Sequence, residues 1–219
     1  MLAIGILCFI FLTNGLTYAQ QSPPLCTQSS SMTVNSTEFN GTWWEVARNP
    51  APTGNWDCVE VNFIMEPQNT ARIATTYSNT PSYLWVNQTM YTDIALGNVV
   101  NGGGYNISYI NGLSNTSYTV YKLLDTDYEN YAFVCGYTNA SDPNTFFGII
   151  LTRDRYPNTT ALNSYEAMAS QNYANFTNGT MSLITQSPTC YAAGAYGLRD
   201  YAILATLLAA LHALVHIAM

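Results

Sequence analysis

Short runs rich in Val, Ile, Thr, Tyr, Phe and Trp dominate the chain between residues 41 and 152. Asn, Gly, Pro and Ser break these runs at close intervals, which is the pattern of strands separated by turns. The predicted strands are residues 41–48, 58–66, 71–77, 84–94, 104–110, 117–125, 130–137 and 146–152. Eight consecutive strands joined by short turns predict an all-β fold, an eight-stranded antiparallel up-and-down β-barrel, because closing the sheet removes its exposed edges.

One segment has a helical period, and it follows the last predicted strand. Its apolar positions recur at three- and four-residue spacing: Leu162, Tyr165, Met168 and Ala169. The segment begins after Pro157, and Thr159 or Thr160 can cap its first turn. We expect one C-terminal α-helix that packs on the outside of the barrel and covers one wall.

The first 19 residues have the pattern of a secretory signal peptide. Residues 1–13 form an apolar run too short to span a bilayer, and the small residue Ala19 precedes the polar Gln20. A buried N-terminal strand or helix is the alternative, but nothing beside the run resembles a turn into a domain. We therefore predict that residues 1–19 are removed and that the mature domain comprises residues 20–192.

The other end of the chain has the pattern of a glycosylphosphatidylinositol (GPI) attachment signal. Residues 201–219 are almost wholly apolar and carry no Lys or Arg, whereas a stop-transfer helix is normally followed by cytoplasmic basic residues. A short polar spacer and the small residues Ala192, Ala193 and Gly194 precede this tail. We expect residues 193–219 to be removed and the protein to sit on the extracellular face of the plasma membrane, or otherwise to be secreted. A retained single-pass helix and a tail that lies on the membrane are the alternatives.

Charge is sparse and acidic. The chain has 13 acidic and 6 basic residues, a net charge of −7, and no basic run, which argues against nucleic acid and anionic membrane surfaces as partners. Glycans would supply the missing surface polarity. Asn-X-Ser/Thr sequons occur at Asn35, Asn40, Asn87, Asn106, Asn115, Asn139, Asn158, Asn175 and Asn178.

The cysteines and the missing histidines limit the chemistry. Once Cys8 leaves with the signal peptide, four cysteines remain, an even set that predicts two disulfides in an oxidising compartment. Metal ligation is the competing interpretation, but no two of them have metal-ligand spacing and both histidines lie in the C-terminal tail. Asp125 and Asp127 are a carboxylate pair that falls on a turn. We therefore expect no metal, no cofactor and no histidine-dependent nucleophilic catalysis, and a protein that is not an enzyme.

Three motifs, in matching order and spacing, resemble the signatures of the lipocalin family. Residues 40–45, Asn-Gly-Thr-Trp-Trp-Glu, resemble the first, Gly-X-Trp-Tyr; residues 126–132, Thr-Asp-Tyr-Glu-Asn-Tyr-Ala, resemble the second; and residues 150–153, which end on an Arg, resemble the third. The matching residues are Gly41, Trp43, Thr126, Asp127, Tyr128 and Arg153. The resemblance covers nearly all of residues 24–190 and is closest to apolipoprotein D and the Lazarillo-type lipocalins, some of which carry a lipid anchor.

This resemblance implies structural roles for the signature residues and the cysteines. Trp43 would plug the closed end of the barrel with the Arg153 guanidinium stacked on its indole, a contact worth about 1–2 kcal/mol when desolvated. Asp127 would cap backbone N–H groups at the same end, and Trp44 stands where the family usually has Tyr. The implied disulfides are Cys26–Cys135 and Cys58–Cys190.

The resemblance also implies that the barrel lumen binds one small hydrophobic ligand, such as a fatty acid, a retinoid, a sterol-like molecule or a tetrapyrrole. The side chains expected to face the lumen are Phe63, Tyr121, Ile149 and Leu151, with Tyr77, Trp85 and Tyr91 near its mouth. All seven can equally be ordinary core residues. A different hypothesis is a GPI-anchored adhesion or signalling glycoprotein, of the axon-guidance type, whose barrel is recognised by another cell-surface protein.

We expect phosphatidylinositol-specific phospholipase C to release the protein from intact cells, because that enzyme cuts GPI anchors and leaves transmembrane helices in place. Immunoblotting of the medium before and after treatment measures the release. Retention at the membrane, while a known GPI-anchored protein is shed from the same cells, would mean that the tail is a retained helix.

Overall fold

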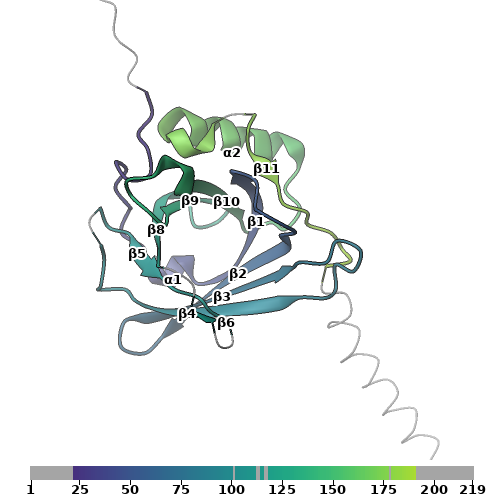
Figure 1. The fold of residues 1–219 in the computed structure, drawn as a ribbon, viewed down its shortest axis with the longest axis horizontal. Coiled ribbons are helices and arrows are strands. Elements are labelled where there is room, and N and C mark those ends of the chain that lie inside the picture. The colour runs from purple at the N-terminus through teal and green to yellow at the C-terminus, as the bar shows by residue number, and fades with distance from the viewer. Residues whose placement is uncertain (1–21, 101, 112–113, 116–117, 178, 191–219) are drawn as a thin grey trace, which may run out of the picture.

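Eight antiparallel strands build the barrel of this computed structural model, which describes residues 22–190 except 101, 112–113, 116–117 and 178. They are β1 (Gly41–Asn49), β2 (Asp57–Glu66), β3 (Thr70–Ser78), β4 (Gln88–Ala95), β5 (Tyr105–Ile107), β8 (Thr119–Thr126), β9 (Tyr131–Tyr137) and β10 (Phe146–Thr152). Figure 1 looks down the barrel, with the strands arranged as a ring. The all-β fold predicted from the sequence is confirmed.

A single chain segment closes the ring. The strands are ordered β5-β8-β9-β10-β1-β2-β3-β4, so the two ends of the path are β5 and β4. β5 pairs with β8, and the next strand, β6 (Ile110–Asn111), pairs with β4 through Ile110 and Tyr91. The strand predicted at residues 104–110 is therefore two short strands that face different neighbours, which leaves the barrel nearly closed.

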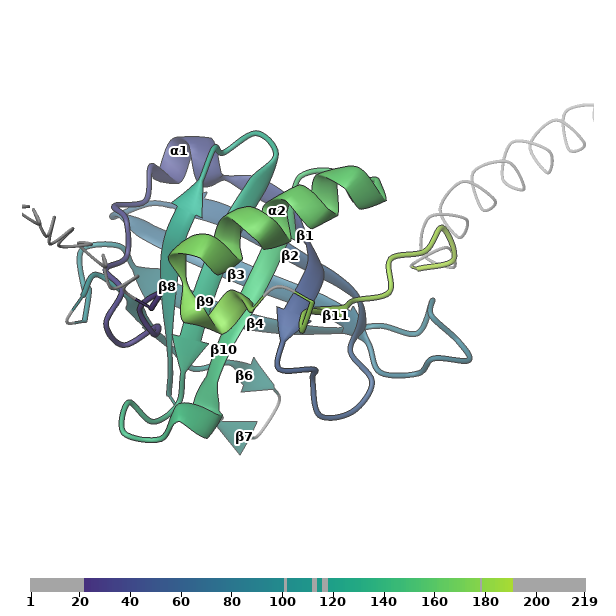
Figure 2. The ribbon, with the colours of Figure 1, turned by 90° about the horizontal axis from the view of Figure 1, so that it is seen from above.

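Five further elements lie around the barrel, together with the predicted helix. They are α1 (Ser36–Phe39), β7 (Ser114–Asn115), β11 (Ser182–Leu183) and two 3₁₀ turns, η1 (Pro143–Thr145) and η2 (Ala174–Phe176), besides α2 (Thr159–Asn172). Figure 2 shows α1 at one end of the barrel, β6 and β7 at the other, and α2 along the outside. In the part of the chain that the structure describes, no helix combines the length and the apolar character needed to cross a bilayer.

The helix α2 covers the wall formed by β1, β9 and β10. Strand alternation sends Ile149 and Leu151 to the lumen and Ile150 to the outer face, where Ile150 is fully buried beside Phe133 and Ala169. The other predicted apolar positions of the helix pack against the same cluster. The expected cap at Thr159 or Thr160 is wrong, because Asn158 precedes the helix and its side chain accepts a hydrogen bond from the Ala161 N–H at 2.9 Å.

The predicted strand 84–94 begins only at Gln88. Two successive turns hold residues 80–86, in which the Tyr83 N–H donates to the Thr80 carbonyl and the Val86 N–H donates to the Tyr83 carbonyl. High strand propensity in this segment is overridden because Pro81 interrupts it and because Tyr83, Trp85 and Val86 have no sheet to pack on; all three are exposed.

The signature residues meet at the closed end of the barrel. The Arg153 Cζ lies 3.9 Å from the centroid of the fully buried Trp43 ring, and the guanidinium donates to the carbonyls of Glu38, Asn40, Thr42 and Tyr128 at 2.8–3.1 Å. The Trp43 Nε1 donates to the Phe39 carbonyl at 2.9 Å. Gly41 has φ +101°, and a side chain there would press on the Arg153 guanidinium.

The β8–β9 turn supplies the rest of this end. The Asp127 carboxylate accepts hydrogen bonds from the backbone N–H groups of Glu129, Asn130 and Tyr131. Burial alone would raise its pKa, but the hydrogen bonds from the Asn130 side chain and these N–H groups outweigh it and lower the pKa of Asp127. The Thr126 hydroxyl accepts from the N–H of Tyr128, a residue with φ +65°.

Two disulfides tie both ends of the described chain to the barrel. Cys26 is bonded to Cys135 and Cys58 to Cys190, which is the pairing that the lipocalin resemblance implies. The paired residues are 109 and 132 positions apart in sequence, so each bond is worth about 4–5 kcal/mol in the chain-entropy model.

The sequons are mostly on the surface. The exposed acceptors are Asn35, Asn40, Asn87, Asn106, Asn139 and Asn158. Asn175 is half-buried, and its side-chain oxygen accepts from the Cys26 N–H at 2.8 Å. The side chain of Asn115 lies outside what the structure describes, as do Asn178, the signal peptide with Cys8, and the anchor residues Ala192, Ala193 and Gly194.

We expect Arg153→Lys to lower the free energy of unfolding by about 2–3 kcal/mol, because a lysine ammonium cannot stack on Trp43 and reach four carbonyls at once. Urea denaturation with intact disulfides measures the loss. Arg72→Lys is the matched control: Arg72 pairs with Asp93 and Glu66 on the surface, so its replacement should leave the midpoint nearly unchanged. Equal losses in the two variants would contradict the role given to Arg153.

Candidate ligand-binding cavity

The barrel encloses a cavity of about 320 Å³. Every one of the eight barrel strands contributes to its wall. The apolar lining includes Val61, Phe63, Ile73, Ile94, Leu123, Ile149 and Leu151. The polar or partly polar lining consists of Glu45, Arg48, Trp56, Thr75, Tyr105, Tyr109, Thr119 and Tyr121. An apolar cavity with a few polar groups is the usual composition of a small-molecule site.

The direction of β1 orders these groups by depth. β1 starts at the closed end, where Trp43 is buried, and runs toward the opposite end, where the β1–β2 loop carries Trp56. Glu45 faces Leu151 across the sheet and Arg48 faces Ile149 one step further out. The polar groups of β1 thus lie above an apolar floor.

A β-bulge brings Glu45 and Arg48 to the same face of β1. Residues three apart on a regular strand point to opposite faces. The β1–β10 register shifts between Glu45 and Ala47, which pair with Leu151 and Ile150 respectively. The extra residue, Val46, joins Ala47 in the outer core, and both charged side chains line the lumen.

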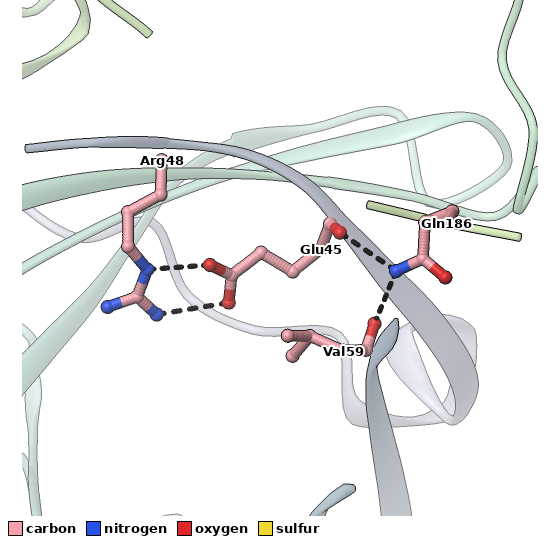
Figure 3. A network of polar contacts seen from close by, with 4 residues as sticks. All are labelled: Glu45, Arg48, Val59 and Gln186. Carbon is pink, nitrogen blue, oxygen red and sulfur yellow. Dashed lines mark hydrogen bonds and ion pairs between the residues drawn. The ribbon is translucent and has the colours of Figure 1, made fainter. Parts of the chain in front are cut away.

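Glu45 and Arg48 form a bidentate ion pair inside the barrel (Figure 3). The Arg48 Nε donates to Glu45 Oε1 at 2.6 Å and Nη2 donates to Oε2 at 3.0 Å. The Glu45 side chain is 2% exposed and that of Arg48 is 17% exposed, so the guanidinium is the partner that the cavity can reach. Charge-assisted pairs of this geometry are among the strongest in proteins.

Gln186 supports this pair from outside the lumen. Its side-chain amide donates to the backbone carbonyls of Glu45 and Val59, each at 3.0 Å, as Figure 3 shows. The β1–β2 ladder ends at Trp44 and Glu60, so Gln186 bridges the two strands where they separate. The C-terminal segment thereby holds the bulge in place.

Three titratable groups of the cavity, Arg48, Tyr109 and Tyr121, stay in their ordinary charge states. Burial alone would lower the pKa of the Arg48 guanidinium, but the charge and hydrogen bonds of Glu45 raise it. Burial raises the pKa of the Tyr121 and Tyr109 phenols, which therefore remain protonated. Tyr109 shares a hydrogen bond of 3.2 Å with the Thr75 hydroxyl.

The four residues expected to face the lumen all line the cavity: Phe63, Tyr121, Ile149 and Leu151. The three expected near its mouth, Tyr77, Trp85 and Tyr91, do not line it. Tyr91 is 52% exposed on the outer face of β4, because alternation sends its neighbour Met90 inward instead. Trp85 lies exposed in the β3–β4 loop against Tyr83. Tyr77 stacks on Trp56, with ring centroids 4.2 Å apart, and it is Trp56 that reaches the cavity.

Sequence reasoning found Tyr121 but missed the other polar groups of the cavity, above all Glu45, Arg48 and Trp56. Alternation from the buried Trp43 could have placed Glu45 inside. The same alternation would place Arg48 on the outer face, because it does not include the bulge after Glu45 that turns the following residues to the opposite face. Trp56 lies in a segment rich in Pro and Gly, and such a segment predicts a turn and not a residue of the cavity wall. Among the described residues, no group of three His, Cys, Asp or Glu side chains could hold a metal ion.

No protein-family model and no curated protein matches the sequence. Solved structures of the lipocalin fold do match. Insecticyanin from the tobacco hornworm Manduca sexta is 16% identical with a TM-score of 0.58, over 78% of this chain and 88% of its own. The amine-binding protein of Rhodnius prolixus, in its tryptamine complex, is 11% identical with a TM-score of 0.57, over 77% and 89%. Lobster apocrustacyanin A1 is 18% identical with a TM-score of 0.52, over 71% and 82%. At these identities the likeness establishes the lipocalin fold.

We expect Arg48→Met to lower the free energy of unfolding by about 3 kcal/mol, because it leaves the Glu45 carboxylate buried without its partner. The double variant Glu45→Gln/Arg48→Met should recover most of that loss, since a neutral amide is cheaper to bury than a carboxylate. Urea denaturation of the parent, both single variants and the double variant measures the coupling. Additive losses would show that the two side chains do not interact.

Proposed function

We propose that the protein is an extracellular lipocalin that binds and carries one small hydrophobic ligand in the barrel lumen. The observation that carries this proposal is the mainly apolar cavity of about 320 Å³ inside the barrel. Small-molecule sites have volumes of about 300–1,000 Å³ and the same mixture of apolar walls and few polar groups. A tightly packed core would leave no such space.

The fold and the signature residues support the family assignment. The tryptamine complex of the Rhodnius prolixus protein is a case of this fold holding a small molecule. Within the lipocalins, the segment 126–132 favours the apolipoprotein D and Lazarillo-type branch, and here Asp127 and Tyr128 shape the turn that Arg153 binds. The ligand itself does not follow from this resemblance.

Two observations support an extracellular location on a GPI anchor. The four cysteines of residues 22–190 all form disulfides, which persist in oxidising compartments. Six sequons present exposed asparagines to glycosylation. The anchor itself rests on the sequence pattern of Ala192, Ala193, Gly194 and the apolar tail.

Carriage fits the cavity better than catalysis. Its charged groups, Glu45 and Arg48, neutralise each other, and the phenols of Tyr109 and Tyr121 are held protonated by burial. No His precedes residue 212 in the sequence. No described residue of the cavity thus forms the nucleophile and base pair that covalent catalysis needs.

Recognition by another cell-surface protein is the second candidate function. The observation that favours it is the group of exposed apolar side chains on the β3–β4 loop, Tyr83, Trp85 and Val86. Protein stripped of ligand with an organic solvent should still engage cells if recognition is the function, and should not if carriage is.

We expect all-trans-retinol to quench tryptophan fluorescence at one-to-one stoichiometry with a Kd of about 1 micromolar or tighter, because burying an isoprenoid chain supplies enough free energy even after association costs. Trp56→Phe should remove most of the quenching, since Trp56 lines the cavity. Trp85→Phe is the matched control and should leave it unchanged. Loss of quenching in Trp85→Phe alone would place the ligand on the loop.

Leu151→Arg should weaken retinol binding at least about tenfold, because it puts an unpaired charge on the apolar floor of the cavity. Ile64→Arg, on the exposed outer face of β2, is the control and should bind as the parent does. Circular dichroism checks that both variants fold. If no apolar ligand binds the parent below about 100 micromolar, the lumen is not a ligand site.

A further inference from the structure

The polar groups that the cavity presents to a ligand are mainly hydrogen-bond donors. Arg48 uses Nε and Nη2 for Glu45, which leaves the N–H groups of Nη1 without a partner among the described residues. The indole Nε1 of Trp56 is buried and likewise has no hydrogen-bond partner there. The Tyr121 hydroxyl, which burial keeps protonated, is a third donor.

These donors lie close to one another at the outer part of the lumen. The Arg48 Cζ is 5.6 Å from the Trp56 ring centroid and 5.5 Å from that of Phe147. Tyr121 packs edge-on against the same Phe147 ring, with centroids 5.2 Å apart. Arg48 and Tyr121 therefore flank the same Phe147 ring, with Trp56 beside Arg48. Trp56 Nε1 is a buried donor without a partner, which costs free energy that an acceptor on a ligand would recover.

Most acceptors, by contrast, are withdrawn from the cavity, and the hydroxyls of Thr119 and Tyr121 are the exceptions. The Glu45 carboxylate is 2% exposed and both of its oxygens already accept from Arg48. The hydroxyls of Tyr109 and Thr75 bond each other, and that of Tyr105 donates to the Leu96 carbonyl. An ammonium group on a ligand would be repelled by the positive charge of Arg48 and would have few acceptors to bind.

A carboxylate on a ligand also fits badly. The Glu45–Arg48 pair is already neutral, so a carboxylate beside it would leave one net negative charge buried in the barrel and close to Glu45. An uncharged acceptor such as a carbonyl or ester oxygen satisfies the same donors and adds no charge.

We propose that the ligand is an apolar molecule with one uncharged acceptor oxygen, held by Arg48 Nη1, Trp56 Nε1 and the Tyr121 hydroxyl, and that the Glu45–Arg48 pair selects it over carboxylates and amines. This inference rests on the proposed function of the barrel as a carrier. The apolar part of the ligand lies on the floor formed by residues such as Phe63 and Leu151, and the oxygen lies toward the open end.

The test compares head groups on one chain. Methyl retinoate, retinoic acid and retinylamine share an isoprenoid chain, and methyl myristate, myristate and tetradecylamine repeat the comparison on an acyl chain; at pH 7.4 the acids are anionic and the amines cationic. Equilibrium dialysis of labelled ligand against protein from cells that express the full chain gives each Kd without relying on tryptophan. We expect both esters to bind about tenfold more tightly than the matching acids and amines.

Two variants separate the donors from the charge pair. Trp56→Phe should weaken ester binding about fivefold, and Trp85→Phe, the same change outside the cavity, should not. Glu45→Gln leaves the Arg48 charge without its partner, so a carboxylate on the ligand would neutralise it, and this variant should bind the acids more tightly than the esters.

Each result decides between the two proposals. Equal affinities for the three head groups, or tighter binding of an acid or an amine, would overturn the inference and leave the carrier function standing. Failure of all six molecules to bind would overturn the carrier function, and the inference with it.

Discussion

The stacking of the Arg153 guanidinium on Trp43 closes one end of the barrel, and the cavity depends on that closure. The same guanidinium binds four backbone carbonyls that belong to α1, its C-terminal cap, β1 and the β8–β9 turn. One side chain thus fixes segments that are far apart in sequence, which a planar fork of donors can do and a point charge cannot. With this end sealed, the loops at the other end are where the lumen can be reached.

The one-residue bulge in β1 decides the chemistry of that lumen. Without it, Arg48 would point to the outer face and Glu45 would remain as a lone buried carboxylate. With it, the two charges pair inside, while Val46 and Ala47 fill the core beneath α2. Gln186 occupies the gap that the bend in β1 opens beside β2, so the C-terminal segment, which Cys190 ties to Cys58, also stabilises the site.

Local patterns were sufficient to predict the eight strands and the face of α2, and the resemblance to lipocalins implied the closed end and both cysteine pairs. They failed where a neighbour decides the structure. Residues 84–87 have strand propensity but no partner strand, and residues 104–110 divide because β8 and β4 each take one half. Tyr91 was placed on the wrong side of its strand and Arg48 was missed for a common reason. The face that a strand residue occupies depends on the strand register and on bulges, which residue types do not encode.

A lumen lined only by apolar side chains would fold at least as well as this one, because the attraction between two buried charges repays only part of their desolvation. The Glu45–Arg48 pair therefore contributes more to specificity than to stability. Trp56 and Phe147 lie against the Arg48 guanidinium, and Glu45 binds the edge that carries Nε and Nη2. Only the edge that carries Nη1 is left to bind another partner. A fixed guanidinium with one free edge sets the orientation of a ligand and selects the chemical group that it binds, whereas an apolar lumen selects ligands only by size.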